Sequence, residues 1–211
     1  MQKLLTLSIV SGALLTGCNS GGTSASENTS LCPVTAPMFT TAVGEQILST
    51  WATNAYAYSP YGNATCVSNG VTYNCTDPYI GAAFFTGVGY TADAVLLPTL
   101  SANILIGSQQ LYGYFTGFLA HGPIATLIES SGPYETLAGC GYGVMSGYYD
   151  FAFSDGTPSA NARYSFQFNY VSTTQYVPIT VESGSESGLQ LIITQSPGWY
   201  IELQNSAQLP S

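Results

Sequence analysis

Residues 162–171 alternate, up to the final Val171, between aromatic or apolar and polar side chains. Every second position from residue 164 is aromatic: Tyr164, Phe166, Phe168 and Tyr170. Arg163 and three neutral polar residues fill the positions between them. Because successive residues of a strand point to opposite faces, this pattern predicts a strand with one strongly apolar face. Such a strand must lie in a sheet whose apolar face packs against a second layer.

Helical patterns come earlier in the chain. Residues 42–56 carry apolar side chains at helical spacing: Val43, Ile47, Leu48, Trp51 and Ala55. A second stripe runs through residues 108–119, with Ser108 as the expected N-cap and Gly122-Pro123 as the stop. Residues 80–85 are expected to form another short helix.

Most further strands are expected in the second half of the chain, at residues 92–98, 124–129, 144–153, 177–181, 189–195 and 199–205. Ser196-Pro197-Gly198 separates the last two and predicts a hairpin turn between them. Since helices come first and strands follow, the predicted class is α+β with an antiparallel sheet.

The first residues have the pattern of an export signal. Residues 1–17 contain one lysine followed by a short apolar run, as in a secretory leader. The run ends Leu15-Thr16-Gly17-Cys18, which resembles the bacterial lipobox and implies acylation of Cys18. The alternative is an ordinary leader with an incidental cysteine. Residues 18–30 have the Gly/Ser/Thr composition of a tether, and the folded domain is expected over residues 31–211.

The lipobox pattern also bears on localisation. Asn19 follows the cysteine, whereas an aspartate there resembles an inner-membrane retention signal. The resemblance therefore implies a lipoprotein of the bacterial cell envelope, anchored in the outer membrane and facing the periplasm or the surface.

Four cysteines remain if Cys18 is acylated, and an exported chain meets an oxidising environment. Three pairings are possible. A bond between Cys66 and Cys75 closes a short loop around the turn signal at residues 68–70, which leaves Cys32 to pair with Cys140. A zinc site is the rival interpretation, but the chain has one histidine and no C-x-x-C, so no metal is expected.

Charged residues make up only 6% of the chain, and Lys3 and Arg163 are its two bases. This composition excludes nucleic-acid binding and docking on anionic lipid, because both need basic patches. Without the leader, one base against 11 acidic residues leaves a net charge of −10. Below about pH 3 the carboxylates are neutral and only Arg163 and His121 carry charge. The composition therefore suits a protein exposed to acid.

Five motifs in order support a family resemblance: residues 90–99 (YTADAVLLPT), 114–123 (YFTGFLAHGP), 146–151 (SGYYDF), 162–166 (ARYSF) and 199–210 (WYIELQNSAQLP). Over roughly residues 40–210 the chain resembles bacterial proteins similar to the association domain of calcium/calmodulin-dependent protein kinase II. These belong to the nuclear transport factor 2-like superfamily, together with SnoaL-like cyclases and ketosteroid isomerase.

The resemblance implies a cone, in which a bent antiparallel sheet wraps around a long helix and leaves a pocket at its open end. It also implies that the sheet forms a dimer interface. The family's arginine lies in or near the cavity, with tyrosines and a late histidine pair around it. In this chain Arg163, Tyr148 and Tyr149 match, and Tyr114 and Gln204 complete the expected ligand-binding set. The alternatives for Arg163 are a structural ion pair with Asp150 or Glu202 and a solvent-facing position on the polar side of its strand.

The match at the histidine pair is incomplete. Gln204 and Asn205 occupy these positions, and amides do not transfer protons near neutral pH. Asp93 could serve as a base but is expected to cap or turn the start of its strand. His121 follows a predicted helix end, where a cation complements the helix dipole. No catalytic residue and no cofactor are assigned.

Three functions remain open. The first is a lipid-anchored binding or assembly module that forms a homodimer or a higher homo-oligomer, without kinase activity, with a cavity for a small anionic or aromatic ligand. The second is a SnoaL-like or ketosteroid-isomerase-like enzyme that uses Asp93 or a tyrosine. The third is a structural envelope protein with a collapsed cavity. A cavity below about 300 Å³ would favour the third over the first.

Overall fold

The computed structural model describes residues 32–33, 35–98, 103–128 and 135–208. The predicted leader, Cys18 and the tether lie outside these residues, as do Leu209 and Pro210. Residues 32–211 form one compact unit. None of the helices in the described part of the chain is long and apolar enough to cross a membrane.

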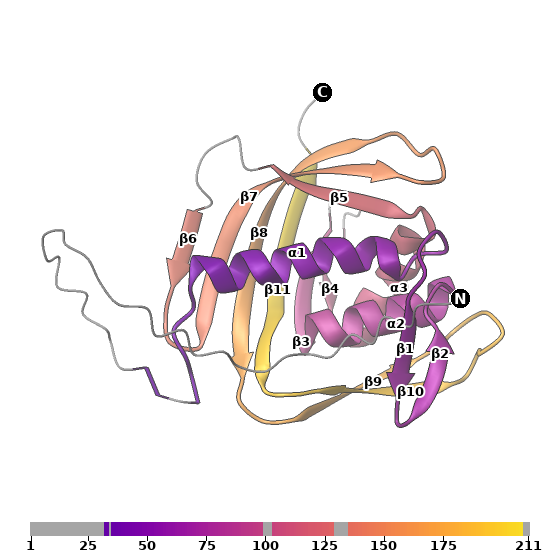
Figure 1. Cartoon of the computed structure of the whole chain (residues 1–211), viewed down its shortest axis with the longest axis horizontal. Helices are drawn as coiled ribbons and strands as arrows, with labels where there is room; N and C mark the ends of the chain where they lie inside the picture. Colours follow the sequence, from indigo (N-terminus) through magenta and orange to yellow (C-terminus); the bar gives the residue numbers. More distant parts are fainter. Residues whose placement is uncertain (1–31, 34, 99–102, 129–134, 209–211) are drawn as a thin grey trace, which may run out of the picture. The chain divides into compact units, whose positions relative to one another are not determined.

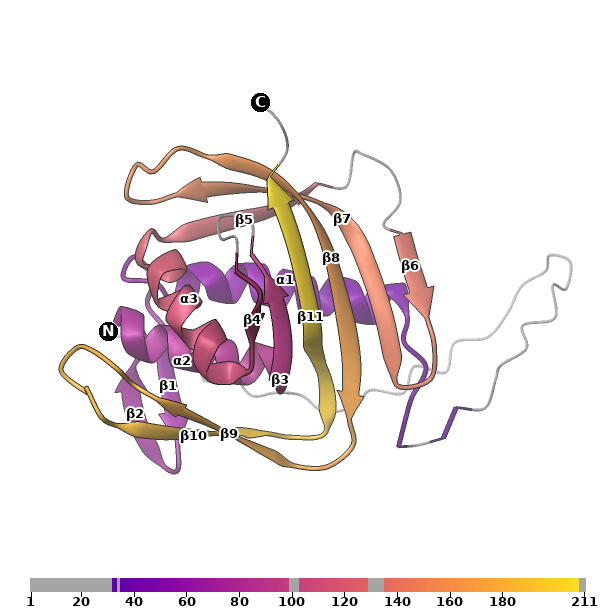
Figure 2. The same cartoon turned by 180° about the vertical axis from the view of Figure 1, so that it is seen from behind.

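The described part of the chain contains three α-helices on one face of a curved sheet (Figure 1). They are α1 (Thr41–Ala57), α2 (Pro78–Gly89) and α3 (Ser108–Ala120). Figure 2 shows the opposite face of the sheet, on which no helix of the described residues lies. This confirms the α+β class.

Capping residues set the helix starts. The side chain of Asp77 accepts hydrogen bonds from the backbone N–H groups of Tyr79 and Ile80, and Pro78 occupies the first turn, so α2 is longer than expected. The expectation for α3 was wrong by one residue. Gly107, with φ of 80°, takes the N-cap position without a side-chain bond, and Ser108 is already helical.

The main sheet has seven strands in the order β4-β3-β11-β8-β7-β5, with β6 also pairing with β7. Their bounds are β3 Tyr90–Leu97, β4 Leu105–Ile106, β5 Pro123–Ile128, β6 Glu135–Ala138, β7 Tyr142–Phe153, β8 Ala160–Val171 and β11 Gly198–Gln208. All pairs are antiparallel except β3 with β11, which is parallel. The sheet is therefore mixed but mostly antiparallel.

The predicted hairpin at Ser196-Pro197-Gly198 does not form. β10 (Gln190–Gln195) pairs with β9 (Gln175–Thr180), whereas β11 pairs with β8 and β3. Gly198 lies opposite Val171, and Gln195 lies opposite Gln175. The four strands thus form one long ribbon that bends at residues 172–174 and 196–197, and the proline marks the corner of this ribbon rather than a chain reversal.

Two disulfides are present, in the expected pairing. Cys66–Cys75 closes the hairpin of β1 (Thr65–Ser68) and β2 (Val71–Asn74), where Asn69 and Gly70 both have positive φ. Cys32–Cys140 joins residues 108 positions apart and ties the segment before α1 to the segment before β7.

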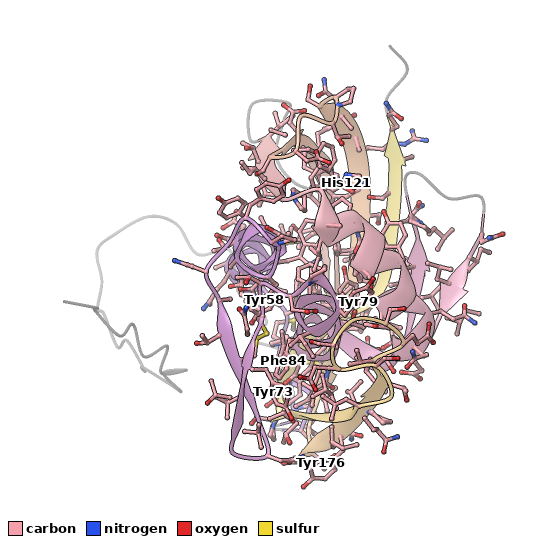
Figure 3. The ribbon with its side chains drawn as sticks, turned by 90° about the vertical axis from the view of Figure 1, so that its right-hand side faces the viewer. Tyr58, Tyr73, Tyr79, Phe84, His121 and Tyr176 are labelled. Carbon is pink, nitrogen blue, oxygen red and sulfur yellow. A yellow bond between two sulfur atoms is a disulfide. The ribbon has the colours of Figure 1, made fainter. Side chains whose placement is uncertain are left out.

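The core between the helices and the sheet is largely aromatic. Trp51 of α1 packs against Phe85, Tyr149, Phe151 and Phe166, with ring centroids 5.6–6.2 Å apart. Tyr164, Phe166 and Phe168 are all buried on the inner face of β8, as their spacing predicts. At the hairpin end of the unit, Tyr73 of β2 packs on Phe84 of α2, with centroids 6.1 Å apart (Figure 3).

Candidate functional site

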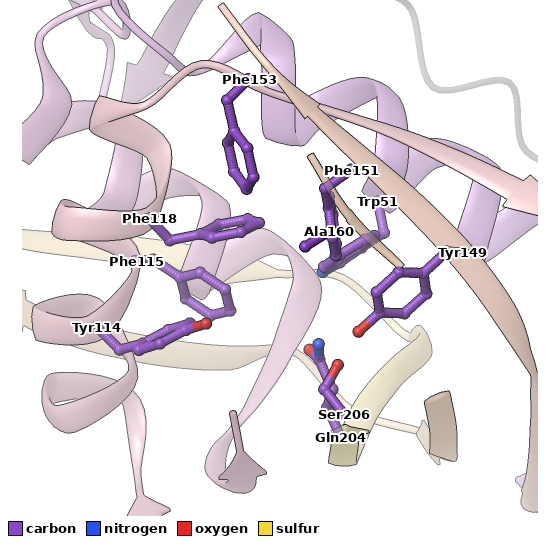
Figure 4. Close-up of a pocket in the computed structure, with 10 residues that line it drawn as sticks. All are labelled: Trp51, Tyr114, Phe115, Phe118, Tyr149, Phe151, Phe153, Ala160, Gln204 and Ser206. Atoms are coloured by element: carbon purple, nitrogen blue, oxygen red, sulfur yellow. The ribbon is translucent and has the colours of Figure 1, made fainter. Parts of the chain in front are cut away.

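A small cavity lies between α1, α3 and the inner face of the sheet (Figure 4). Its lining consists of Trp51, Tyr114, Phe115, Phe118, Tyr149, Phe151, Phe153, Ala160, Gln204 and Ser206. The cavity volume is about 20 Å³. A volume of this size holds a single water molecule, and it is far below the several hundred Å³ of a pocket for a drug-sized ligand.

Polar groups gather at one end of this aromatic cavity. Trp51 Nε1 donates a hydrogen bond of 2.7 Å to the hydroxyl of Tyr90, which in turn donates to Gln204 Oε1. Figure 4 shows the hydroxyl of Tyr149 pointing toward the heads of Gln204 and Ser206. Ser206 Oγ is buried and has no hydrogen-bond partner among the described residues. One water molecule at this end could satisfy it.

Burial controls the titration of the phenols at the site. Desolvation raises the pKa of Tyr114 to about 12, because burial penalises the charged phenolate. Burial likewise raises the pKa of Tyr90 well above its usual value. Both groups therefore keep their protons at neutral pH and can act as hydrogen-bond donors but not as bases.

Three of the five expected ligand-binding residues meet at this cavity. Tyr114 comes from α3, Tyr149 from β7 and Gln204 from β11, and all three line it. Tyr149 and Gln204 are buried, and Gln204 accepts its bond from Tyr90. Whether they bind a ligand stays a prediction.

The other two expected residues lie elsewhere. Arg163 and Tyr148 are exposed and face each other in the register of β7 and β8. Their neighbours Ala162 and Tyr149 are buried on the inner face, so the period of two places Arg163 and Tyr148 on the outer face of the sheet. The expectation that Arg163 lies in or near the cavity is therefore corrected. The alternating pattern of β8 correctly indicated that Arg163 lies on the outer face. The family motif, which implied a position in or near the cavity, gave the wrong prediction.

Several lining residues were not among the expected site residues. Phe115 and Phe118 belong to the predicted apolar stripe of the third helix, and Phe151 and Phe153 follow the expected Tyr149 at the period of one strand face. Their spacing was therefore a usable signal for the inner face. For Ser206, no local pattern in the sequence distinguishes it from the other serines.

The remaining candidates lie outside the cavity. Asp93 is exposed within β3 rather than at its start, and it does not line the cavity. His121 follows α3, as expected, and its Nδ1 lies 2.6 Å from Oδ2 of Asp155. Thr157 donates its backbone N–H to the same carboxylate. These bonds lower the pKa of Asp155 to about 2, with the His121 contact contributing most.

A second hollow is an open groove on the surface between α1 and β5, with a volume of about 550 Å³. Its lining is uncharged: Ser49, Ala52, Thr53, Tyr56, Ile124, Ala125, Thr126 and Leu127. Among the described residues, no group of three or more His, Cys, Asp or Glu side chains could hold a metal ion.

No protein-family model matches the chain, and no curated protein matches it. Two solved structures are similar to it in fold. One, from Xanthomonas campestris, is described as a calcium/calmodulin dependent protein kinase II association domain; it is 19% identical, with a TM-score of 0.48, over 80% of this chain and 86% of that one. The other is a nuclear transport factor 2-like superfamily protein from Salmonella enterica serovar Typhimurium, 11% identical, with a TM-score of 0.44, over 82% and 95%. Both are of the kinds that the sequence motifs resemble, and the likeness concerns the fold alone.

Proposed function

We propose that the chain is an exported, lipid-anchored assembly module that forms a homodimer through the outer face of its sheet and carries no catalytic activity. The observation that carries this proposal is the outer face itself. No helix of the described residues lies on it (Figure 2), so its central strands are open to a partner.

The composition of the outer face supports an interface. On β7 and β8 the outward side chains are Tyr142, Val144, Ser146, Tyr148 and Asp150, followed by Arg163, Ser165, Gln167 and Asn169. Tyrosine and arginine are enriched at protein interfaces, whereas lysine and glutamate are depleted there. Tyr142 is 52% exposed and Tyr148 is 38% exposed, so both have surface left to bury.

The inner cavity supports assembly over catalysis. Among the described residues, the lining contains no carboxylate and no histidine, and Tyr114, with a pKa of about 12, keeps its proton at neutral pH. Proton abstraction of the ketosteroid-isomerase type needs a base near the operating pH. A cavity of about 20 Å³ also leaves no room for a substrate beside these residues. By the volume criterion of about 300 Å³, this cavity favours a structural role over ligand binding, so the proposed module assembles without a small-molecule ligand in it.

The anchor part of the proposal rests on the sequence alone. A short leader, a lipobox-like ending at Cys18 and a polar tether would hold the folded unit near a membrane of the cell envelope. Intact mass spectrometry of protein from a bacterial host tests it. We expect a chain that begins at Cys18 and carries the added mass of acyl chains, and a Cys18→Ser variant that lacks this mass. A wild-type chain without the added mass of acyl chains would contradict the proposed lipid anchor.

The dimer is tested by sedimentation velocity on the mature chain over a range of micromolar concentrations. We expect a dimer, and we expect Gln167→Glu combined with Asn169→Glu to give a folded monomer, because like charges then oppose each other across the interface. A Thr53→Glu variant, with the new charge on the solvent-exposed side of α1, is the control and should remain a dimer. A wild-type monomer at every concentration, or equal effects of both changes, would overturn the proposed interface.

A further inference from the structure

Arg163 is an exposed base that has no ion-pair partner among the described residues. Lys3 and Arg163 are the only Lys or Arg residues of the sequence, and Lys3 lies in the predicted leader. Among the described residues, the ion pair that the structure contains joins His121 to Asp155 instead. The nearest explanation for a base on a strand, a structural ion pair within the chain, is therefore not what the structure shows.

Asp150, on the same outer face, is an acidic residue with an oxygen that lacks a hydrogen-bond partner among the described residues. Its side chain is partly buried, and Oδ1 is covered without any hydrogen-bond partner among the described residues. This oxygen has lost its hydration and has gained no compensating bond from the described residues.

The register of the sheet makes the two residues diagonal neighbours. Arg163 lies opposite Tyr148, and Asp150 lies opposite Asn161, one pair further along. Diagonal positions on one face of an antiparallel pair are about 7–8 Å apart. A twofold axis that lies in the plane of the interface and runs midway between the two would place each above its counterpart in a second copy.

We propose that Arg163 forms an ion pair with Asp150 of the partner subunit, twice in each dimer, and that this reciprocal pair fixes the register of the interface. The inference rests on the proposed dimer through the outer face. Because Oδ1 of Asp150 is covered within its own subunit, the guanidinium of the partner donates to the other carboxylate oxygen, Oδ2. A second copy is the occupant that the charges favour, since it supplies a complementary charge for each of the two groups.

Fixing the register is the main contribution of such a pair. On β7 and β8 the other outward side chains are neutral, and most of them carry similar hydroxyl or amide groups. A neutral, repetitive surface permits several sliding arrangements, whereas two reciprocal ion pairs select one of them. Any other arrangement of the two subunits would bury these charges without a partner, and the cost of burying an unpaired charge disfavours such arrangements.

A charge exchange tests whether the pair forms between subunits. Arg163→Asp leaves two acidic groups in each subunit, and Asp150→Arg leaves two basic groups. We expect each variant alone to dimerise at least about 10-fold more weakly than the wild type. An equimolar mixture should form a heterodimer of near wild-type affinity, because opposite charges again face each other in both places. Sedimentation velocity and native mass spectrometry report the species.

The outcomes separate this inference from the proposed function. A wild-type monomer would sink the dimer and the pair together. A wild-type dimer whose two variants fail to recover affinity when mixed would overturn the pair and leave the dimer standing, since an ion pair within one chain gains nothing from mixing.

A cross-linking measurement covers the case in which Asp150→Arg does not fold. In an Arg163→Lys variant, a carbodiimide can join the new amine to a carboxylate that contacts it. We expect a covalent dimer whose cross-linked peptide contains Asp150, and no such product in Arg163→Gln. A cross-link to Asp150 found only in monomers, or none at all in a dimeric sample, would overturn the pair.

Discussion

At the scale of single residues, the buried phenol of Tyr90 is the centre of the polar chain behind the cavity. Its hydroxyl accepts from Trp51 Nε1 and donates to Gln204 Oε1, and the residue is fully buried. Tyr90→Phe would leave both partners buried and unsatisfied. Each such group costs about 1–3 kcal/mol, so we expect the free energy of unfolding to fall by about 2–4 kcal/mol in urea titrations.

Tyr142→Phe is the matched control, because this phenol is half exposed on the outer face. Its free energy of unfolding should stay within about 0.5 kcal/mol of the wild type. Equal losses in the two variants would mean that the buried chain of hydrogen bonds contributes nothing specific.

The pair of His121 and Asp155 predicts a response to acid. Its bonds lower the pKa of Asp155 to about 2 in the folded state, against a usual value of about 3.9. A lowered folded pKa stabilises the protein above the unfolded value, and this contribution is lost as the pH falls through the folded value. We therefore expect Asp155→Asn to lower the urea midpoint at pH 5, with the difference shrinking between about pH 4 and pH 2.

Asp93→Asn, which removes an exposed carboxylate of β3, is the control. It should show a smaller difference at pH 5. A difference for Asp155→Asn that stayed constant down to pH 1.5 would contradict the assigned role of the carboxylate.

At the scale of elements, two helical glycines predict opposite responses to the same substitution. A Cβ at Gly81 in α2 would lie 2.1 Å from the carbonyl oxygen of Tyr58 and 2.5 Å from that of Cys75, so backbone would have to move. A Cβ at Gly113 in α3 would meet nothing within 4 Å. We expect Gly81→Ala to destabilise by about 2 kcal/mol or more, and Gly113→Ala to stabilise by about 0.5–1 kcal/mol.

Thermal and urea unfolding of the two variants check this pair. The usual gain from alanine in a helix depends on free space, which only Gly113 has. Stabilisation by Gly81→Ala would show that α2 does not pack on the backbone of residues 58 and 75 as described.

Most elements followed from sequence periodicity, and the errors came at their connections. The first helix, β8 and β7 matched their apolar patterns to within two residues, because burial of one face dictates the spacing. Ser196-Pro197-Gly198 was wrong as a hairpin turn. A proline-glycine pair marks a break in regular pairing, but the strand that comes next depends on contacts far along the chain.

At the scale of the whole molecule, the charge composition predicts resistance to acid. The chain contains 11 acidic residues, two bases and one histidine. Below about pH 3, protonation of the carboxylates leaves few charges of any kind, and self-repulsion stays small. We expect the circular dichroism spectrum at pH 2.5 to match that at pH 7.

A variant that carries lysine at the exposed positions Ser185, Gln190 and Thr194 is the control. Added positive charge should make it lose structure at a higher pH than the wild type. Loss of the wild-type spectrum at pH 2.5 would refute the adaptation to acid.

The sequence by itself determined most of the longer elements, the α+β class and the inner face of β8, because alternating burial is a local property of a strand. It also favoured the pairing of Cys66 with Cys75, since a turn brings neighbours together. Only the tertiary structure decided that the inner cavity closes to about 20 Å³ and that Arg163 lies on the opposite face. Both features depend on how side chains that are distant in the sequence pack together in the core. A local sequence pattern therefore does not predict the cavity volume or the position of Arg163 relative to the cavity.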